Sequence, residues 1–161
     1  MASKAEILEY LQAVKDPEIP VLAIEDLGII REVLINDNEV HVQISPTYSG
    51  CPAMDMIEVE IKAALQEQGF ESTVELVLAP AWSTDWITPK GRSVLEEYGI
   101  AAPLEESVDK RALMGEANIV KCVNCGSHDT KMVSQFGSTA CKALFQCNVC
   151  YEPLDYFKCL K

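Results

Sequence analysis

Two short stretches, Cys122-Val123-Asn124-Cys125-Gly126 and Cys147-Asn148-Val149-Cys150, decide how the last forty or so residues of this chain fold. In each stretch two residues separate the cysteines, so one tight turn can direct both thiolates at the same point. Four thiolates match the closed tetrahedral site of structural zinc. So short a segment cannot bury a large core, and a bound metal would supply its folding energy. The sequence therefore predicts a zinc ribbon with Cys122, Cys125, Cys147 and Cys150 as ligands.

The identity of this metal, and the role of two further cysteines, stay open at this point. The same four ligands also suit iron, either alone or as a cluster. Cys141 and Cys159 are either small buried residues or extra ligands. His128 follows the first cysteine pair and is expected to be a surface turn residue, because four cysteines already complete the site.

The composition of the 161 residues is that of a globular protein, with 48% hydrophobic and 24% charged residues. No apolar run is long enough for a membrane helix, and the N-terminus lacks the pattern of a signal peptide. We therefore expect a cytoplasmic protein that does not bind membranes and keeps its seven cysteines reduced.

The net charge of −12 argues against a nucleic-acid partner. Residues 1–120 carry 8 Lys and Arg against 22 Asp and Glu, whereas residues 121–161 carry 5 against 3. An acidic body repels phosphate backbones, and so weakly basic a tail does not reverse the repulsion. An acidic surface of this kind would instead suit a basic patch on a protein partner.

Hydrophobic periodicity over the first hundred residues predicts a compact αββαβα domain, an α/β (α+β) fold with a small mixed sheet. A strand–helix–strand order favours a parallel pairing. Proline ends the first helix, so 16–20 is predicted to be a rigid loop, and Asn36-Asp37-Asn38 suits a hairpin turn. The predicted elements are helix 3–14, strand 27–35, strand 40–45, helix 52–69, strand 74–78 and helix 88–99.

Three segments result from this pattern. Residues 1–100 form the first domain, 101–120 lose periodicity and are predicted to be a linker, and 121–161 form the β-rich zinc ribbon.

Cys51 stands at the start of the second predicted helix, where free N–H groups and the helix dipole favour a thiolate. Such a thiolate could hold iron transiently or act as a nucleophile, and the alternative is an inert buried cysteine. A cysteine hydrolase needs a nearby base, and neither His41 nor His128 is placed to serve as one. Nucleophilic catalysis is therefore not expected, and we assign no catalytic residue.

Two other groups of residues have both a structural and a functional interpretation. Asp16 and Glu18 flank Pro17, where they either end a helix, or ligate a metal or contact a partner. Trp82 and Trp86 are either core residues or a docking patch, because tryptophan is enriched at interface hot spots.

Several motifs resemble known families. The segments 16–20 (DPEIP), 26–29 (DLGI) and 50–52 (GCP) are similar to iron–sulfur assembly factors of the MIP18 type and their bacterial SufT relatives. The segments 48–54 (YSGCPAM), 80–87 (PAWSTDWI), 136–143 (FGSTACKA) and 147–159 resemble the phenylacetate-degradation D proteins, over nearly the whole chain.

This resemblance implies an accessory or maturation factor for the multicomponent 1,2-phenylacetyl-CoA epoxidase, whose oxygenase or reductase subunits would be its partners. Cys51 would hold an iron or iron–sulfur cargo, with Asp16, Glu18 and Thr47 near it, and the four paired cysteines would hold zinc. Relatives often carry threonine where this chain has Ser45. The resemblance also suggests a homodimer through the first domain.

Three alternatives remain. The chain is a stably bound docking subunit that carries only zinc, a cysteine-based transferase or hydrolase, or a zinc-ribbon nucleic-acid binder.

Overall fold

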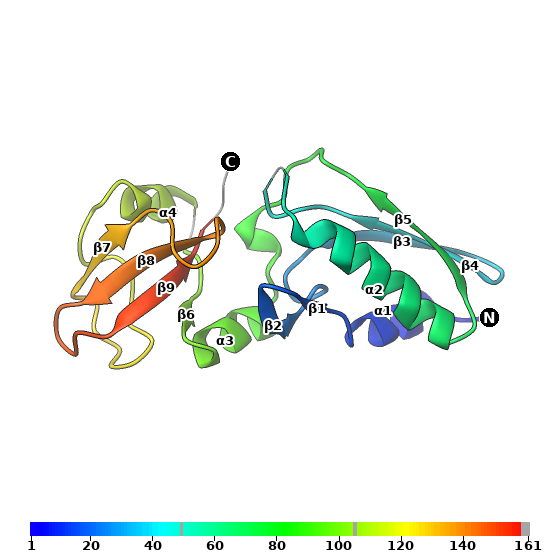
Figure 1. The fold of residues 1–161 in the computed structure, drawn as a ribbon, viewed down its shortest axis with the longest axis horizontal. Coiled ribbons are helices and arrows are strands. Elements are labelled where there is room, and N and C mark those ends of the chain that lie inside the picture. Colours follow the sequence, from blue (N-terminus) through cyan, green and yellow to red (C-terminus); the bar gives the residue numbers. More distant parts are fainter. Residues whose placement is uncertain (49, 105, 159–161) are drawn as a thin grey trace. The chain divides into compact units, whose positions relative to one another are not determined.

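The computed structural model describes residues 1–48, 50–104 and 106–158, and it divides into two compact units, Met1–Thr88 and Pro89–Lys161 (Figure 1). Cys159 lies outside the described residues. None of the helices found in the described residues is long and apolar enough to cross a membrane.

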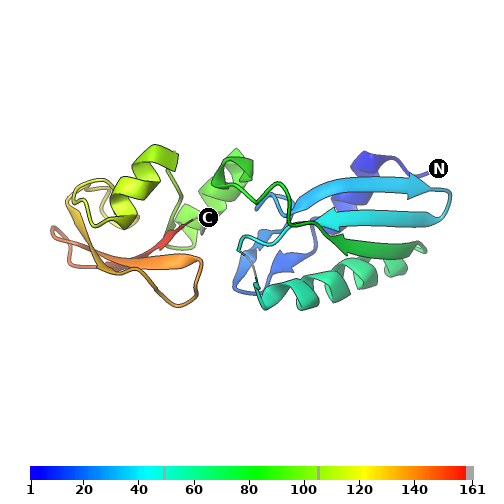
Figure 2. The same cartoon turned by 90° about the horizontal axis from the view of Figure 1, so that it is seen from above.

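The first unit is built on a three-stranded sheet with the order β3-β4-β5 (Figures 1 and 2). β3 (Ile30–Asn36) and β4 (Glu39–Ile44) form an antiparallel hairpin, and Asp37 in its turn has a φ of +54°. β5 (Glu71–Leu76) runs parallel to β4 after the crossover helix α2 (Ala53–Glu67). The α/β fold with a small mixed sheet is therefore confirmed.

The core of the first unit lies between this sheet and two helices. α1 (Lys4–Leu11) and α2 pack on the same face of the sheet (Figures 1 and 2). A capping box starts α1, because the Ser3 side chain accepts from the Glu6 N–H and the Glu6 carboxylate accepts from the Ser3 N–H. The buried side chains of this core include Ile7, Leu11, Val33, Val42, Ile57, Ile61 and Leu65.

The predicted loop at 16–20 is instead a short antiparallel hairpin of β1 (Lys15–Asp16) and β2 (Ile19–Ala23). The Asp16 carboxylate accepts hydrogen bonds from the backbone N–H groups of Glu18 (2.7 Å) and Ile19 (3.1 Å). These hydrogen bonds form the turn of the hairpin around Pro17. The presence of a proline alone does not predict this turn.

The predicted strand 27–35 begins three residues later, at Ile30. Gly28 adopts a φ of +78°, a left-handed conformation that interrupts an extended chain. A Cβ at Gly28 would lie 2.6 Å from the Trp86 carbonyl oxygen, so only glycine fits this approach. Trp82 covers the same turn and donates from Nε1 to the Leu27 carbonyl at 3.0 Å. A 3-10 turn, η1 (Thr84–Trp86), ends the first unit's elements.

The second unit begins with α3 (Pro89–Glu97) and contains a four-stranded sheet with the order β6-β9-β8-β7. β7 (Thr130–Ser134), β8 (Lys142–Cys147) and β9 (Pro153–Phe157) form an antiparallel meander. β6 (Ile100–Ala101) adds to it in parallel with β9.

The segment predicted to be a linker, 101–120, takes part in this unit through β6 and the helix α4 (Glu106–Leu113). Two residues that α4 buries are Asp109 and Ala112, an acid and a small side chain. Hydrophobic periodicity therefore misses the helix. Asp109 is held in the core because it accepts a hydrogen bond from the Tyr156 hydroxyl.

A glycine pair tests the close approach at Gly28. Gly28→Ala should lower the free energy of unfolding by about 2 kcal/mol more than Gly69→Ala, because the added methyl group meets the Trp86 backbone. Gly69 also has a positive φ, +87°, but nothing lies within 4 Å of its Cβ position, so it controls for backbone strain alone. Urea unfolding followed by tryptophan fluorescence measures this unit, which contains both tryptophans. Equal losses for the two variants would contradict the packing argument.

Candidate metal centre and cysteine site

Four sulfur atoms meet at one point in the second unit. The Cys122 and Cys150 Sγ atoms lie 3.7 Å apart, and those of Cys125 and Cys147 lie 3.6 Å apart. All four lie within 4.8 Å of one another. A zinc ion with Zn–S bonds of about 2.3 Å at tetrahedral angles separates its ligand sulfurs by about 3.8 Å. The four cysteines therefore form a metal site whose spacing and ligand chemistry fit zinc.

Two turns of similar build present these thiols. In the first, the Gly126 N–H donates to the Cys122 carbonyl at 2.9 Å, and Gly126 has a φ of +78°. In the second, the residue at the equivalent position is Tyr151, with a φ of +63°. The Cys147 N–H donates to the Glu152 carbonyl at 3.0 Å. A residue in the left-handed conformation thus follows each cysteine pair, although only the first of these two residues is a glycine.

Two amide groups also contact the sulfurs. The Val149 N–H donates to Cys147 Sγ at 3.4 Å, and Asn124 Nδ2 donates to Cys150 Sγ at 3.6 Å. The Asn124 contact, together with a backbone hydrogen bond from Glu152 and the neighbouring cysteine thiols, lowers the pKa of the Cys150 thiol to about 6. Amide donors of this kind stabilise ligating thiolates.

Cys141 does not join the four-cysteine group, which is the one group of three or more potential ligand residues in the described ranges. It is buried, and its sulfur lies 3.0 Å from the Thr139 hydroxyl. This position favours the interpretation as a core residue. His128 is exposed and also lies outside the group, as expected for a turn residue.

Cys51 lies just before α2 and is half-buried. Its N–H donates to the Tyr48 carbonyl at 3.3 Å, and the adjacent Gly50 has a φ of +79°. The β1–β2 hairpin places the carboxylates of Glu18 and Asp16 close enough to act electrostatically on the thiol. The structure therefore places Asp16 and Glu18 within electrostatic range of Cys51.

The pKa of the Cys51 thiol is raised rather than lowered. Burial is the main cause, and the negative charges of Glu18 and Asp16 add to it. Hydrogen bonds from the Ala53 backbone and the Tyr48 side chain act in the opposite direction and do not compensate. The expected thiolate at the helix N-terminus is thus corrected: the neutral thiol is favoured while no cation is bound.

Two further hydroxyl residues, Ser45 and Thr47, lie in the segment that precedes Cys51. Thr47 is buried, and it precedes Cys51 by four positions in the sequence. Ser45 donates to the Val77 carbonyl at 2.6 Å, so its hydroxyl ties the end of β4 to the segment after β5. Among the described residues, the group around Cys51 does not form a ready-made cage, since only the four ribbon cysteines bring three or more potential ligands together.

The two tryptophans have different environments. Trp82 is 2% exposed and forms part of the core, which does not favour a docking role. Trp86 is partly exposed, and the Arg31 guanidinium lies 3.9 Å from its ring centroid. His41 bonds to Thr73 at 2.8 Å and to Glu75 at 3.0 Å on the sheet, so its ring is already engaged there.

Comparison with known protein families gives two matches. The family described as "Iron-sulfur cluster assembly protein" matches residues 4–76, which include Asp16, Glu18, Thr47 and Cys51. The family described as "PaaD zinc beta ribbon domain" matches residues 106–158, which include all four ribbon cysteines.

Two solved structures resemble more than half of this chain. A domain of unknown function from Bacillus anthracis is 26% identical with a TM-score of 0.54, covering 57% of this chain and 90% of its own. A conserved hypothetical protein from Thermotoga maritima is 29% identical with a TM-score of 0.50, covering 61% and 95%.

Curated relatives extend the likeness. An "Fe-S protein maturation auxiliary factor" of Bacillus subtilis (strain 168) is 33% identical over 87 residues, covering 52% of this chain and 84% of its own. The D component of the "Putative 1,2-phenylacetyl-CoA epoxidase" of Escherichia coli (strain K12) is 47% identical over 156 residues, covering 96% and 92%. With this identity over almost its whole length, the chain belongs to the family of the 1,2-phenylacetyl-CoA epoxidase D components.

Proposed function

We propose that this chain is an accessory maturation factor for phenylacetyl-CoA epoxidase, and that Cys51 holds an iron or iron–sulfur cargo for that enzyme. The observation that carries the proposal is the half-buried Cys51 thiol within electrostatic reach of the carboxylates of Asp16 and Glu18. All three residues lie in the segment that matches iron–sulfur cluster assembly proteins. Two relatives, which cover 55% and 52% of this chain, are named as Fe-S protein maturation auxiliary factors.

The chemistry of the group suits a cargo that must leave again. Cys51 offers a single sulfur, and the carboxylates offer oxygen, which binds iron less tightly than a set of four thiolates does. A bound cation favours the thiolate and so offsets the raised pKa of Cys51. The carboxylates that oppose the thiolate in the free protein would then become attractive charges beside the metal.

The ribbon has a different role in this proposal. Its four thiolates enclose a resident zinc ion that holds the second unit together and presents a stable surface to the client. We expect the client to be an oxygenase or reductase component of the epoxidase. A homodimer through the first unit remains a prediction.

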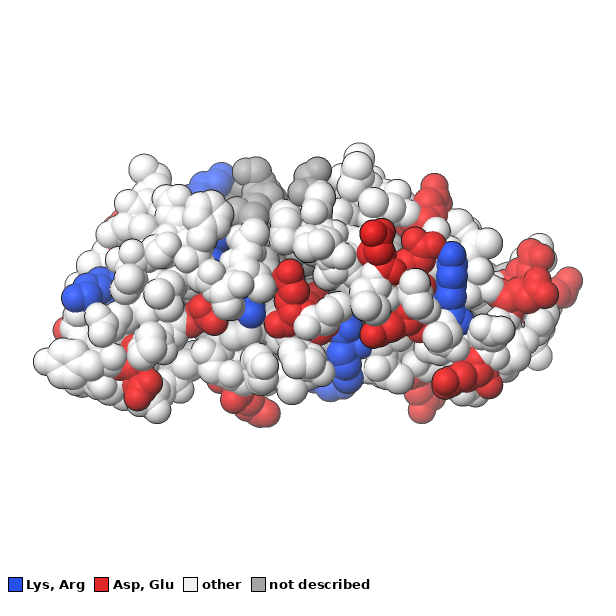
Figure 3. Space-filling view, in the orientation of Figure 1, with Lys and Arg blue, Asp and Glu red and all other residues white. Residues whose placement is uncertain are grey.

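Charge distribution supports a protein client for the first unit. Residues 1–88 carry 16 Asp and Glu against 4 Lys and Arg, whereas residues 89–161 carry 9 of each. Figure 3 shows the acidic side chains gathered over the face that carries α2. A basic patch on a client would be attracted to this face, and a nucleic acid would be repelled by it.

The second candidate is a docking subunit that carries only zinc. The raised pKa of Cys51 favours it, because a neutral thiol is a poor iron ligand. A cysteine hydrolase finds less support, since His41 is engaged on the sheet by Thr73 and Glu75.

Zinc content tests the ribbon. The purified chain should carry about one zinc per molecule, and Cys147→Ser should lose it, because three remaining ligands hold zinc far more weakly. Cys141→Ser, a buried cysteine outside the group, is the matched control and should keep its zinc. Elemental analysis measures both. Full zinc in Cys147→Ser would exclude the four-thiolate site.

Anaerobic reconstitution with iron and sulfide tests the cargo site. The wild type should gain iron and visible charge-transfer absorption, whereas Cys51→Ser should gain about tenfold less iron because the thiol of the proposed site is gone. Both should keep equal ribbon zinc, and Cys141→Ser should behave as the wild type does. Equal iron in wild type and Cys51→Ser would overturn the cargo role and leave the zinc-only docking role.

The alkylation rate of Cys51 tests its electrostatics. Glu18→Gln removes a negative charge that raises the pKa of Cys51, so the pKa falls, and more thiolate is present at pH 8. Alkylation by iodoacetamide, followed at the Cys51 peptide by mass spectrometry, should accelerate about twofold. Glu39→Gln, an exposed carboxylate at the start of β4, should leave the rate unchanged. A slower reaction in Glu18→Gln would contradict the assigned cause.

A further inference from the structure

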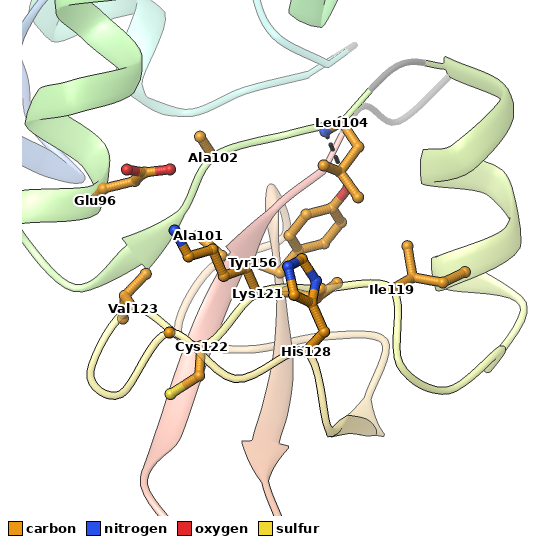
Figure 4. A pocket seen from close by; sticks show the side chains of 12 residues that line it. Glu96, Ala101, Ala102, Leu104, Ile119, Lys121, Cys122, Val123, His128 and Tyr156 are labelled. Carbon is orange, nitrogen blue, oxygen red and sulfur yellow. Dashed lines mark hydrogen bonds between the residues drawn. The ribbon is translucent and has the colours of Figure 1, made fainter.

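A cavity of about 300 Å³ lies in the second unit, which does not contain the residues proposed for the cargo (Figure 4). It opens between the segment that begins with β6 and the segment that leads into the first cysteine pair. Apolar side chains form most of its lining, among them Ala101, Leu104, Val120 and Tyr156. Neither metal ligation nor the cargo proposal accounts for it.

The ring of Tyr156 lines the cavity, and its hydroxyl group already makes two hydrogen bonds within the protein. The Tyr156 hydroxyl donates to the buried Asp109 carboxylate and accepts from the Leu104 N–H at 3.3 Å. Burial and the neighbouring Asp109 raise the pKa of Tyr156, so the hydroxyl stays neutral. The ring therefore serves the cavity as a fixed apolar surface.

Three polar side chains contribute to the lining. Glu96 comes from α3, whereas Lys121 and His128 come from the segment that carries the first cysteine pair (Figure 4). Within the described ranges, none of these three side chains makes a hydrogen bond or ion pair with another residue. Their donors and acceptor are thus available to a ligand.

The charges of the lining restrict what can bind. Lys121 contributes one positive charge and Glu96 one negative charge. An anionic ligand would be attracted by Lys121 and repelled by Glu96. A cationic ligand would be attracted by Glu96 and repelled by Lys121. Compared with a ligand of a single charge sign, a ligand without charge avoids both penalties and still exchanges hydrogen bonds with these groups.

We propose that this cavity binds a small uncharged molecule with an apolar body and one amide-like hydrogen-bonding end. The volume corresponds to about ten non-hydrogen atoms, since a water molecule in the liquid occupies about 30 Å³. The apolar body lies against Tyr156, Leu104 and Val120, and the end group lies at Lys121 and Glu96. This site is independent of the cargo role of Cys51.

Ligand binding at this site is linked to the ribbon metal. Cys122, a metal ligand, and Gly126, in the turn beside it, both line the cavity. Their positions depend on the closed cysteine turn, so the cavity forms only in the folded ribbon, which a bound metal would stabilise. A ligand of the native state in turn stabilises that state by mass action.

The test uses three probes that share a benzyl body and differ in charge: phenylacetamide, phenylacetate and 2-phenylethylamine. Amide NMR shifts of the zinc-loaded full chain give a dissociation constant for each. We expect phenylacetamide to bind about fivefold more tightly than either ion, with shifts at Ala101, Leu104 and Val120. Absence of shifts at these residues for all three probes, or tighter binding of either ion, would overturn the proposal.

Charge variants sharpen the test. Glu96→Gln removes the repulsion of phenylacetate, which should then bind about threefold more tightly than to the wild type. Lys121→Gln should improve binding of 2-phenylethylamine by a similar factor. Glu97→Gln on the same helix and Lys131→Gln on β7 are matched controls outside the lining and should change neither. Zinc content confirms that each variant keeps its ribbon, and unchanged probe selectivity in both lining variants would refute the assigned roles.

Discussion

The second unit depends on four thiolates held at one point. Cross-pairs of sulfurs at 3.6 and 3.7 Å join the turn at Cys122–Cys125 to the turn that follows β8. Thiolates at this distance repel one another strongly unless a cation lies between them. A metal ion at this site would therefore turn four mutually repelling groups into a stabilising contact between the two cysteine turns.

The rest of this unit extends outward from the metal site in steps. β8 carries Cys147 and pairs with β9, and β9 places Tyr156 where its hydroxyl bonds to Asp109 of α4. β6 pairs with the other edge of β9 and supplies one wall of the cavity. The first unit is held by apolar side chains between a sheet and two helices, and the second unit has a hydrophobic core of its own that includes Val120, Phe145 and Leu154. Hydrophobic burial thus contributes to both units, and the second unit adds a four-cysteine metal site to it.

Local rules predicted the features that depend on adjacent residues. The cysteine spacing identified the metal site, and alternation with a strand–helix–strand order identified the parallel pairing of β4 and β5. Features that depend on single side-chain contacts escaped prediction. The β1–β2 hairpin follows from the Asp16 carboxylate, and α4 buries Asp109 and Ala112 in place of large apolar residues. Tyr151 has a positive φ, as Gly126 does in the first turn. A glycine at this position indicates a positive φ in the sequence, whereas a tyrosine does not.

The environment of Cys51 shows why a site is harder to predict than a fold. Sequence position supplies the helix N-terminus, which favours a thiolate. Burial and the carboxylates of Asp16 and Glu18 oppose it, and they reach Cys51 only through folding, from more than thirty residues away. The net effect favours a neutral thiol until a cation arrives. The two cysteine sites of this chain therefore differ in kind: the ribbon brings four thiols together at one metal site, whereas Cys51 is a single thiol near carboxylates.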